Sequence, residues 1–151
     1  MRFLNNILWL LGLLLCFGCQ IPQSSNNWVK LSDKVNIRTI SEYTEGDYLQ
    51  VRMDISEQDK NPVYATGKEG YDRRLRYFNS SILKDVSISG KNGERIYPFD
   101  MNTERNFGYK NYLTVLFFFS VEKEQLDEID HIQFFDNCFG IGKVKLEFKL
   151  Q

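Results

Sequence analysis

DYLQVRMDIS, residues 47–56, is the clearest indication of the fold, because apolar and polar side chains alternate along the stretch. In an extended chain, successive side chains point to opposite faces. One face therefore carries Leu49, Val51, Met53 and Ile55, and the other carries Gln50, Arg52 and Asp54. This period of two predicts a half-buried strand in an antiparallel sheet that has one solvated face.

Other stretches predict further strands. Residues 143–150 alternate in the same way, with lysines outside and with Val144, Leu146, Phe148 and Leu150 inside. Residues 112–121 are apolar on both faces, which predicts a central strand covered on two sides. A strand over residues 82–89 should lead into a hairpin at Asn92-Gly93, because both residues accept positive φ. The remaining candidate strands are residues 28–32, 35–40, 94–97 and 131–135.

One short helix is expected over residues 121–129, where Ser120 would cap the first turn and Glu122 and Glu124 would favour its positive end. The composition suits strands, since aromatic residues make up 15% of the chain and proline occurs only 3 times. A chain of 151 residues suits one domain. We therefore expect an all-β fold, an antiparallel β-sandwich of about seven to nine strands with one short helix; the alternative is a small β-barrel.

The N-terminus has the pattern of a targeting signal. Arg2 precedes an apolar run over residues 7–17, which is 11 residues long. A membrane-spanning helix needs roughly 20 apolar residues. The run is therefore too short for a span and has the length of a signal-peptide core.

The end of this run, Leu15-Cys16-Phe17-Gly18-Cys19, resembles the lipobox of bacterial lipoproteins. The small Gly18 before Cys19 matches the pattern, whereas Cys16 and Phe17 depart from it. The resemblance implies cleavage before Cys19 and acylation of its thiol, which would hold the chain on a lipid bilayer. Gln20 stands where these lipoproteins carry Asp if they are retained in the inner membrane, so the resemblance implies the outer membrane of a bacterial cell envelope.

Residues 112–150 show a weaker resemblance to the immunoglobulin-like modules of bacterial lipoproteins, in which a strongly apolar strand leads into a short charged segment and two closing strands. The Cys/Trp/Cys core of antibody domains is absent from the sequence. The expected organisation is a lipoprotein signal peptide over residues 1–18, a lipidated cysteine with a flexible tether over residues 19–27, and a β-sandwich domain over residues 28–151.

Catalytic and metal chemistry find little support in the sequence. The single histidine, His131, should point outward from its strand beside Gln133, and no nucleophile motif accompanies it. Cys138 precedes the last strand and is interpreted as a packed thiol, because its neighbours are Asp136 and aromatic residues and cations are lacking. The acidic residues between 122 and 130 are interrupted by Lys123 and form no calcium loop. We expect no catalytic residue, no metal and no cofactor.

Two stretches combine arginine with aromatic residues, a mixture that is enriched at protein interfaces. Residues 61–80 are expected to form a loop or strand, and residues 99–111 a long loop. The alternative is that their aromatic side chains fold into the sandwich and leave the arginines in water. The partner-binding candidates are Tyr71, Arg73, Arg74, Arg76, Tyr77, Arg105, Phe107 and Tyr109.

The formal net charge of −1 gives no reason to expect a nucleic-acid partner. The sequence favours a membrane-anchored envelope lipoprotein whose non-enzymatic domain binds a partner protein in an accessory or assembly role. Two alternatives remain. An inhibitor or immunity-type lipoprotein would carry a protruding acidic or aromatic loop, and a carrier of a small ligand or glycan would have an open pocket lined by aromatic residues.

Overall fold

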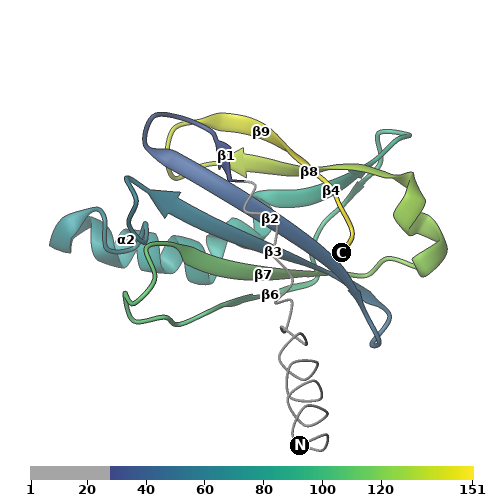
Figure 1. Cartoon of the computed structure of the whole chain (residues 1–151), viewed down its shortest axis with the longest axis horizontal. Helices are drawn as coiled ribbons and strands as arrows, with labels where there is room; N and C mark the ends of the chain where they lie inside the picture. Colours follow the sequence, from purple (N-terminus) through teal and green to yellow (C-terminus); the bar gives the residue numbers. More distant parts are fainter. Residues whose placement is uncertain (1–27) are drawn as a thin grey trace, which may run out of the picture.

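The computed structural model describes residues 28–151 (Figure 1). The predictions for residues 1–18 and 19–27, including the acylation of Cys19, lie outside the described residues. The elements in chain order are β1 (Val29–Lys30), β2 (Val35–Thr44), β3 (Tyr48–Glu57), α2 (Gly67–Asn79), η1 (Ser81–Lys84), β4 (Val86–Gly90), β5 (Arg95–Ile96), β6 (Asp100–Thr103), β7 (Leu113–Phe119), η2 (Lys123–Glu128), β8 (Ile129–Asp136) and β9 (Gly142–Glu147), where η marks a 3-10 helix.

The strands form two antiparallel sheets that pack face to face (Figure 1). One sheet has five strands in the order β1-β2-β3-β7-β6, and the other has four in the order β5-β4-β8-β9. This confirms the predicted antiparallel sandwich; the alternative, a closed barrel, is not formed by the described strands. No helix within residues 28–151 is long and apolar enough to cross a bilayer.

The strand order is that of an immunoglobulin-type sandwich. The orders β2-β3-β7-β6 and β5-β4-β8-β9 correspond to A-B-E-D and C′-C-F-G of that fold, and β1 is an addition at one edge. An isolated parallel bridge joins Ser41 of β2 to Leu150, which follows the end of β9, and so links the two sheets. In this topology the β3–β4, β6–β7 and β8–β9 connections emerge at the same end of the sandwich, and α2 lies within the first of them (Figure 1).

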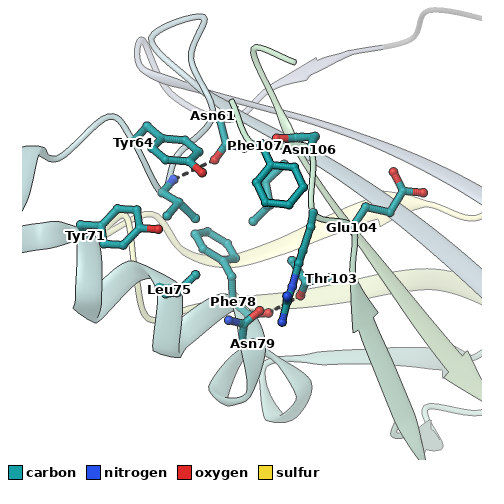
Figure 2. A pocket seen from close by; sticks show the side chains of 13 residues that line it. Asn61, Tyr64, Tyr71, Leu75, Phe78, Asn79, Thr103, Glu104, Asn106 and Phe107 are labelled. Atoms are coloured by element: carbon teal, nitrogen blue, oxygen red, sulfur yellow. Dashed lines mark hydrogen bonds between the residues drawn. The ribbon is translucent and has the colours of Figure 1, made fainter. Parts of the chain in front are cut away.

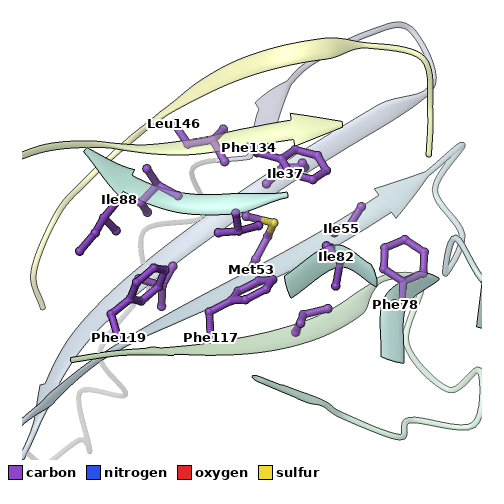
Figure 3. Close-up of a cluster of buried hydrophobic side chains, with 14 of the residues drawn as sticks. Ile37, Met53, Ile55, Phe78, Ile82, Ile88, Phe117, Phe119, Phe134 and Leu146 are labelled. Atoms are coloured by element: carbon purple, nitrogen blue, oxygen red, sulfur yellow. The ribbon is translucent and has the colours of Figure 1, made fainter. Parts of the chain in front are cut away.

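The alternation in residues 47–56 sets the core. Leu49, Val51, Met53 and Ile55 are fully buried on the inner face of β3. Phe117 and Phe119 of β7 lie beside them in the same sheet, and Phe134 of β8 belongs to the facing sheet. Phe78 of α2 and Ile82 of η1 close one end (Figure 3). Burying such apolar side chains contributes roughly 1.5–3 kcal/mol each. The space between the sheets is a filled hydrophobic core.

The predicted helix over residues 121–129 is wrong in type and capping. The structure has the six-residue 3-10 helix η2 there, and its N-cap is Glu122 instead of Ser120. The Glu122 side chain accepts from the backbone of Gln125, and the Gln125 side chain accepts from the N–H of Glu122. This reciprocal capping satisfies the backbone donors of a short turn that ends at once in β8.

The α-helix lies instead in residues 61–80, for which we expected a loop or strand. Tyr71, Leu75 and Phe78 follow the helical spacing i, i+4, i+7, and only Phe78 of α2 is fully buried. Gly67 and Gly70 obscure the helical signal, because glycine is a poor helix former. Gly70 has a local reason, since a Cβ at this position would lie 2.4 Å from the Thr66 side chain.

Four smaller expectations also differ from the structure. Residues 82–89 begin in η1, and the strand starts only at Val86. The expected loop over residues 99–111 contains β6. The last strand ends at Glu147, so that Leu150 is largely exposed. Of the two residues expected at Asn92-Gly93 to have positive φ, only Gly93 does.

Candidate partner-binding surface

A cleft of about 270 Å³ lies between α2 and the β6–β7 connection (Figure 2). Val63, Phe78 and Leu113 give it an apolar floor, because all three belong to the buried core. Tyr71 lines the helix side, and Phe107 lines the side of the β6–β7 connection. The end of the sandwich where three connections meet therefore carries a partly open apolar site.

Two asparagines hold the β6–β7 connection in place. The buried Asn61 donates from Nδ2 to Oδ1 of Asn106 at 3.1 Å. Asn106 in turn donates from Nδ2 to the carbonyl oxygen of Tyr112 at 2.8 Å and accepts from the N–H of Gly108 at 3.2 Å. The side chains of Asn61 and Asn106 thus fasten the loop to the β3–α2 connection at both ends of its turn.

This loop presents two aromatic rings to solvent. Phe107 is 76% exposed and Tyr109 is 92% exposed. Phe107 also has φ 47, a left-handed conformation that a bulky side chain adopts at a cost of about 1–3 kcal/mol. Gly108, with φ 81, completes the turn beside the ring of Tyr64. We call the exposed side chains of Tyr64, Phe107 and Tyr109 the aromatic rim.

The three arginines of α2 separate into two kinds. Arg74 is 11% exposed at its side chain, forms an ion pair with Glu57 at 3.2 Å, and lies 4.5 Å above the ring of Phe139. Arg73 and Arg76 point to solvent. Arg74 therefore fastens the helix to the β3 end and to the β8–β9 turn, and only Arg73 and Arg76 are accessible.

Tyr77 is also part of the scaffold. Its hydroxyl donates to Oδ2 of Asp85 at 2.8 Å, and its ring packs edge-on against Phe78. Burial raises the pKa of Tyr77 far above its ordinary value, and the hydrogen bond to Asp85 adds to the shift. The phenol therefore stays protonated and unavailable to a partner.

The eight predicted residues are thus only partly brought together. Tyr71, Arg105 and Phe107 line the cleft, and Tyr109 stands at the tip of the same loop. Arg73 and Arg76 are exposed on α2, whereas Arg74 and Tyr77 serve the scaffold. Tyr64, Asn61 and Asn106 are not among the predicted residues, and the only sequence signal for any of them is the Asn106-Phe-Gly108 turn pattern.

The remaining titratable candidates occupy structural positions. Burial raises the pKa of the Cys138 thiol to about 11, although the nearby Arg74 acts in the opposite direction. Asp136 accepts from the backbone N–H groups of Cys138, Phe139 and Ile141, at 2.7–2.8 Å, and so builds the β8–β9 turn.

His131 lies 2.8 Å from Asp130 and is less exposed than expected. Gln133, expected in solvent, is buried. Among residues 28–151, no group of three or more His, Cys, Asp or Glu side chains is placed to hold a metal ion.

No protein-family model, no curated protein and no solved structure matches the chain. The likeness to immunoglobulin-type sandwiches therefore rests on strand order.

Proposed function

We propose that the chain is a bacterial envelope lipoprotein, anchored through acylated Cys19 in the outer membrane, whose non-enzymatic sandwich binds a partner protein. The observation that carries the binding role is the aromatic rim. Phe107 and Tyr109 are exposed to water on a loop that Asn61 and Asn106 hold rigid. Large aromatic rings on a preorganised loop are the groups that contribute most to protein interfaces, because little conformational entropy is lost on binding.

The cleft beside the rim supports the same role. Its apolar floor and the neighbouring Arg105 could receive one side chain of the partner while the rim covers the surrounding surface. Function on sandwich folds commonly lies in the connections at one end, where loops vary and the sheets stay rigid. The exposed Arg73 and Arg76 would then lie at the polar edge of the interface.

The size of the native complex tests the binding role. Membranes are extracted with a mild detergent, and the species that contains this chain is sized by sedimentation. The double variant Phe107→Asn and Tyr109→Ser should shift the chain to the size of the free protein, since asparagine tolerates positive φ and preserves the loop. Phe99→Ser is the matched control, because Phe99 is 61% exposed on a different part of the surface. Equal complex size in the rim variant would refute the rim as the interface.

Membrane fractionation tests the anchor separately. The wild-type chain should incorporate labelled palmitate and sediment with outer membranes, whereas Cys19→Ala should do neither. A wild-type chain that is soluble and unlabelled would exclude the anchor but leave the rim unaffected.

An inhibitor or immunity-type role is the second candidate, and the protruding loop favours it. Phe107 and Tyr109 project on a short turn that could enter the active cleft of an enzyme. The two roles separate once the partner is identified, because only an inhibitor would lower the catalytic activity of a partner enzyme in a purified mixture.

A further inference from the structure

A second cleft, of about 330 Å³, lies on the outer face of the four-stranded sheet. The β-sheet register places Ser87 of β4 opposite Gln133 of β8, and both point away from the core. Each is nonetheless only 4% exposed overall. Larger side chains therefore wall in this pair, and we call the resulting hollow the basic trough.

Three cations line the basic trough: Lys84 of η1, Arg95 of β5 and Lys143 of β9. Lys145 adds a fourth beside the floor, opposite Gln133 in the register. Within residues 28–151, none of these four forms an ion pair. The trough therefore holds positive charge that the described part of the chain does not neutralise by direct contact.

The carboxylate that lines the trough is already engaged by other side chains, as are two carboxylates of β8 and β9. Asp85, which lines the trough, accepts from the Tyr77 hydroxyl and from Asn137 Nδ2, both at 2.8 Å. Glu147 pairs with Lys149 at 2.8 Å, and Asp130 lies 2.8 Å from His131. With Lys84, Arg95 and Lys143 against Asp85, the lining residues carry a net charge of +2.

Two aromatic rings complete the walls. Tyr97 and Phe135 are each more than half exposed, and Phe135 lies directly opposite Lys143 across the β8–β9 pair. Arginine and lysine bind carboxylates by charge-assisted hydrogen bonds, and exposed rings pack against the apolar stems of acidic side chains. The chemistry of the trough is therefore that of a site for a negatively charged ligand with some apolar surface.

The spacing of the cations favours a ligand with several carboxylates over a single compact anion. Arg95 and Lys143 belong to β5 and β9, the two edge strands, with β4 and β8 between them. Neighbouring strands lie about 4.8 Å apart, so these two backbones are roughly 14 Å apart. Cations that extend from backbones this far apart suit several acidic side chains along one segment better than one compact phosphate.

We propose that the basic trough binds an acidic segment of a protein, through several carboxylates laid across β5, β4, β8 and β9. The site is separate from the aromatic rim and does not depend on it. A membrane surface is the less favoured occupant. Trp28, where the described chain begins, packs against Tyr112 on the outer face of the opposite sheet. The anchor proposed at Cys19 would therefore hold that sheet, and not the trough, towards the bilayer.

Titration calorimetry on the full chain in non-ionic detergent micelles at low ionic strength tests the proposal. The probes are hexaglutamate, inorganic phosphate, and phosphatidylglycerol added to the micelles. Hexaglutamate should bind, and the affinity should fall as salt is added. The triple variant Lys84→Gln, Arg95→Gln and Lys143→Gln should weaken binding at least tenfold.

The matched control removes three exposed cations from α2 by Lys68→Gln, Arg73→Gln and Arg76→Gln. It should change hexaglutamate affinity less than twofold, with circular dichroism confirming that both triple variants are folded. Equal weakening in the two variants, or absence of hexaglutamate binding to the wild type, would overturn the proposal. So would preferential binding of phosphate or of phosphatidylglycerol that the trough variant abolishes.

Discussion

The two outer faces of the sandwich both carry cationic side chains at outward strand positions, but they differ in whether a buried carboxylate pairs with them. On the five-stranded sheet, Asp54 is completely buried between Arg38 and Arg52 and accepts from the Thr114 hydroxyl at 2.7 Å. On the four-stranded sheet, the cations of the basic trough have no carboxylate partner among the described residues. A charged residue at an outward strand position therefore indicates binding only when no neighbouring side chain compensates its charge.

Aromatic residues further enclose the cluster of Arg38, Asp54 and Arg52 on the five-stranded face. The guanidinium of Arg38 lies 5.0 Å from the ring centre of Trp28 and 5.7 Å from that of Tyr112. Its Nε donates to Oδ2 of Asp54 at 3.0 Å, while Nε of Arg52 donates to Oδ1 at the same distance. These contacts hold Asp54 and Arg38 largely away from water, and together with the partly exposed Arg52 they form part of the scaffold.

Replacing Asp54 should have the largest effect on stability. Asp54→Ala would leave two guanidinium groups without their shared carboxylate in a partly buried site. We expect the free energy of unfolding to fall by about 3 kcal/mol, as is typical when one partner of a buried ion pair is removed. Urea denaturation monitored by circular dichroism measures the change.

The matched control is Asp33→Ala, which breaks the exposed pair Lys30–Asp33. Its effect should stay below about 0.5 kcal/mol, because exposed ion pairs contribute little. If Asp54→Ala lowered the free energy of unfolding as little as Asp33→Ala, the stability of the protein would not depend on the ion pairs that Asp54 forms with Arg38 and Arg52.

The same contrast can be tested on one helix by changing neighbouring arginines. Arg74→Ala removes the ion pair with Glu57 and the contact with Phe139, and should cost about 1–2 kcal/mol. Arg73→Ala should change the free energy of unfolding by less than about 0.5 kcal/mol, because Arg73 is exposed. Thermal denaturation of the two variants compares them directly, and similar melting temperatures would contradict the distinction.

Alkaline pH should reveal the half-buried Cys138 thiol beside Arg74. Burial raises the pKa of Cys138 from 9.0 to about 11, so the unfolded chain releases this proton at lower pH than the folded protein. The stabilising contribution is complete below pH 9 and is lost as the pH rises towards 11. Urea denaturation between pH 8 and pH 11.5 should show a steeper loss for the wild type than for Cys138→Ala, and parallel curves would place the thiol in water.

The smallest effect on stability is expected at the basic trough of the four-stranded sheet. Each of Lys84→Gln, Arg95→Gln and Lys143→Gln should change the free energy of unfolding by less than about 0.5 kcal/mol, because none of these side chains has an ion-pair partner to lose. Urea denaturation of the three single variants checks this. A loss above 1 kcal/mol in any of them would assign that cation to the scaffold.

The sequence predicts the sheets well, because strand alternation is a direct record of which face is buried. Residues 47–56 show it, since every apolar residue in Leu49–Ile55 is buried and the polar residues point away from the core. The helix α2 could not be predicted in the same way. Its glycines lower helix propensity, and only one of its residues, Phe78, is fully buried in the core.

The site was predictable in composition but not in arrangement. Phe107 and Tyr109 were identified because aromatic residues beside arginine are typical of interfaces. Their rigidity depends on the bond between Asn61 and Asn106, which lie 45 residues apart. Arg74 likewise differs from Arg73 because the fold places Glu57 and Phe139 beside it. Such tertiary pairings leave no periodic signal in one sequence.

Photo-crosslinking in living cells tests the partner-binding role of the aromatic rim most directly. Benzoylphenylalanine is introduced at position 107 and, as the control, at position 99, where the native phenylalanine is also exposed. We predict one discrete crosslinked protein from position 107 and none from position 99. Identical crosslinking patterns from both positions, or no adduct from position 107, would contradict a partner bound at the rim.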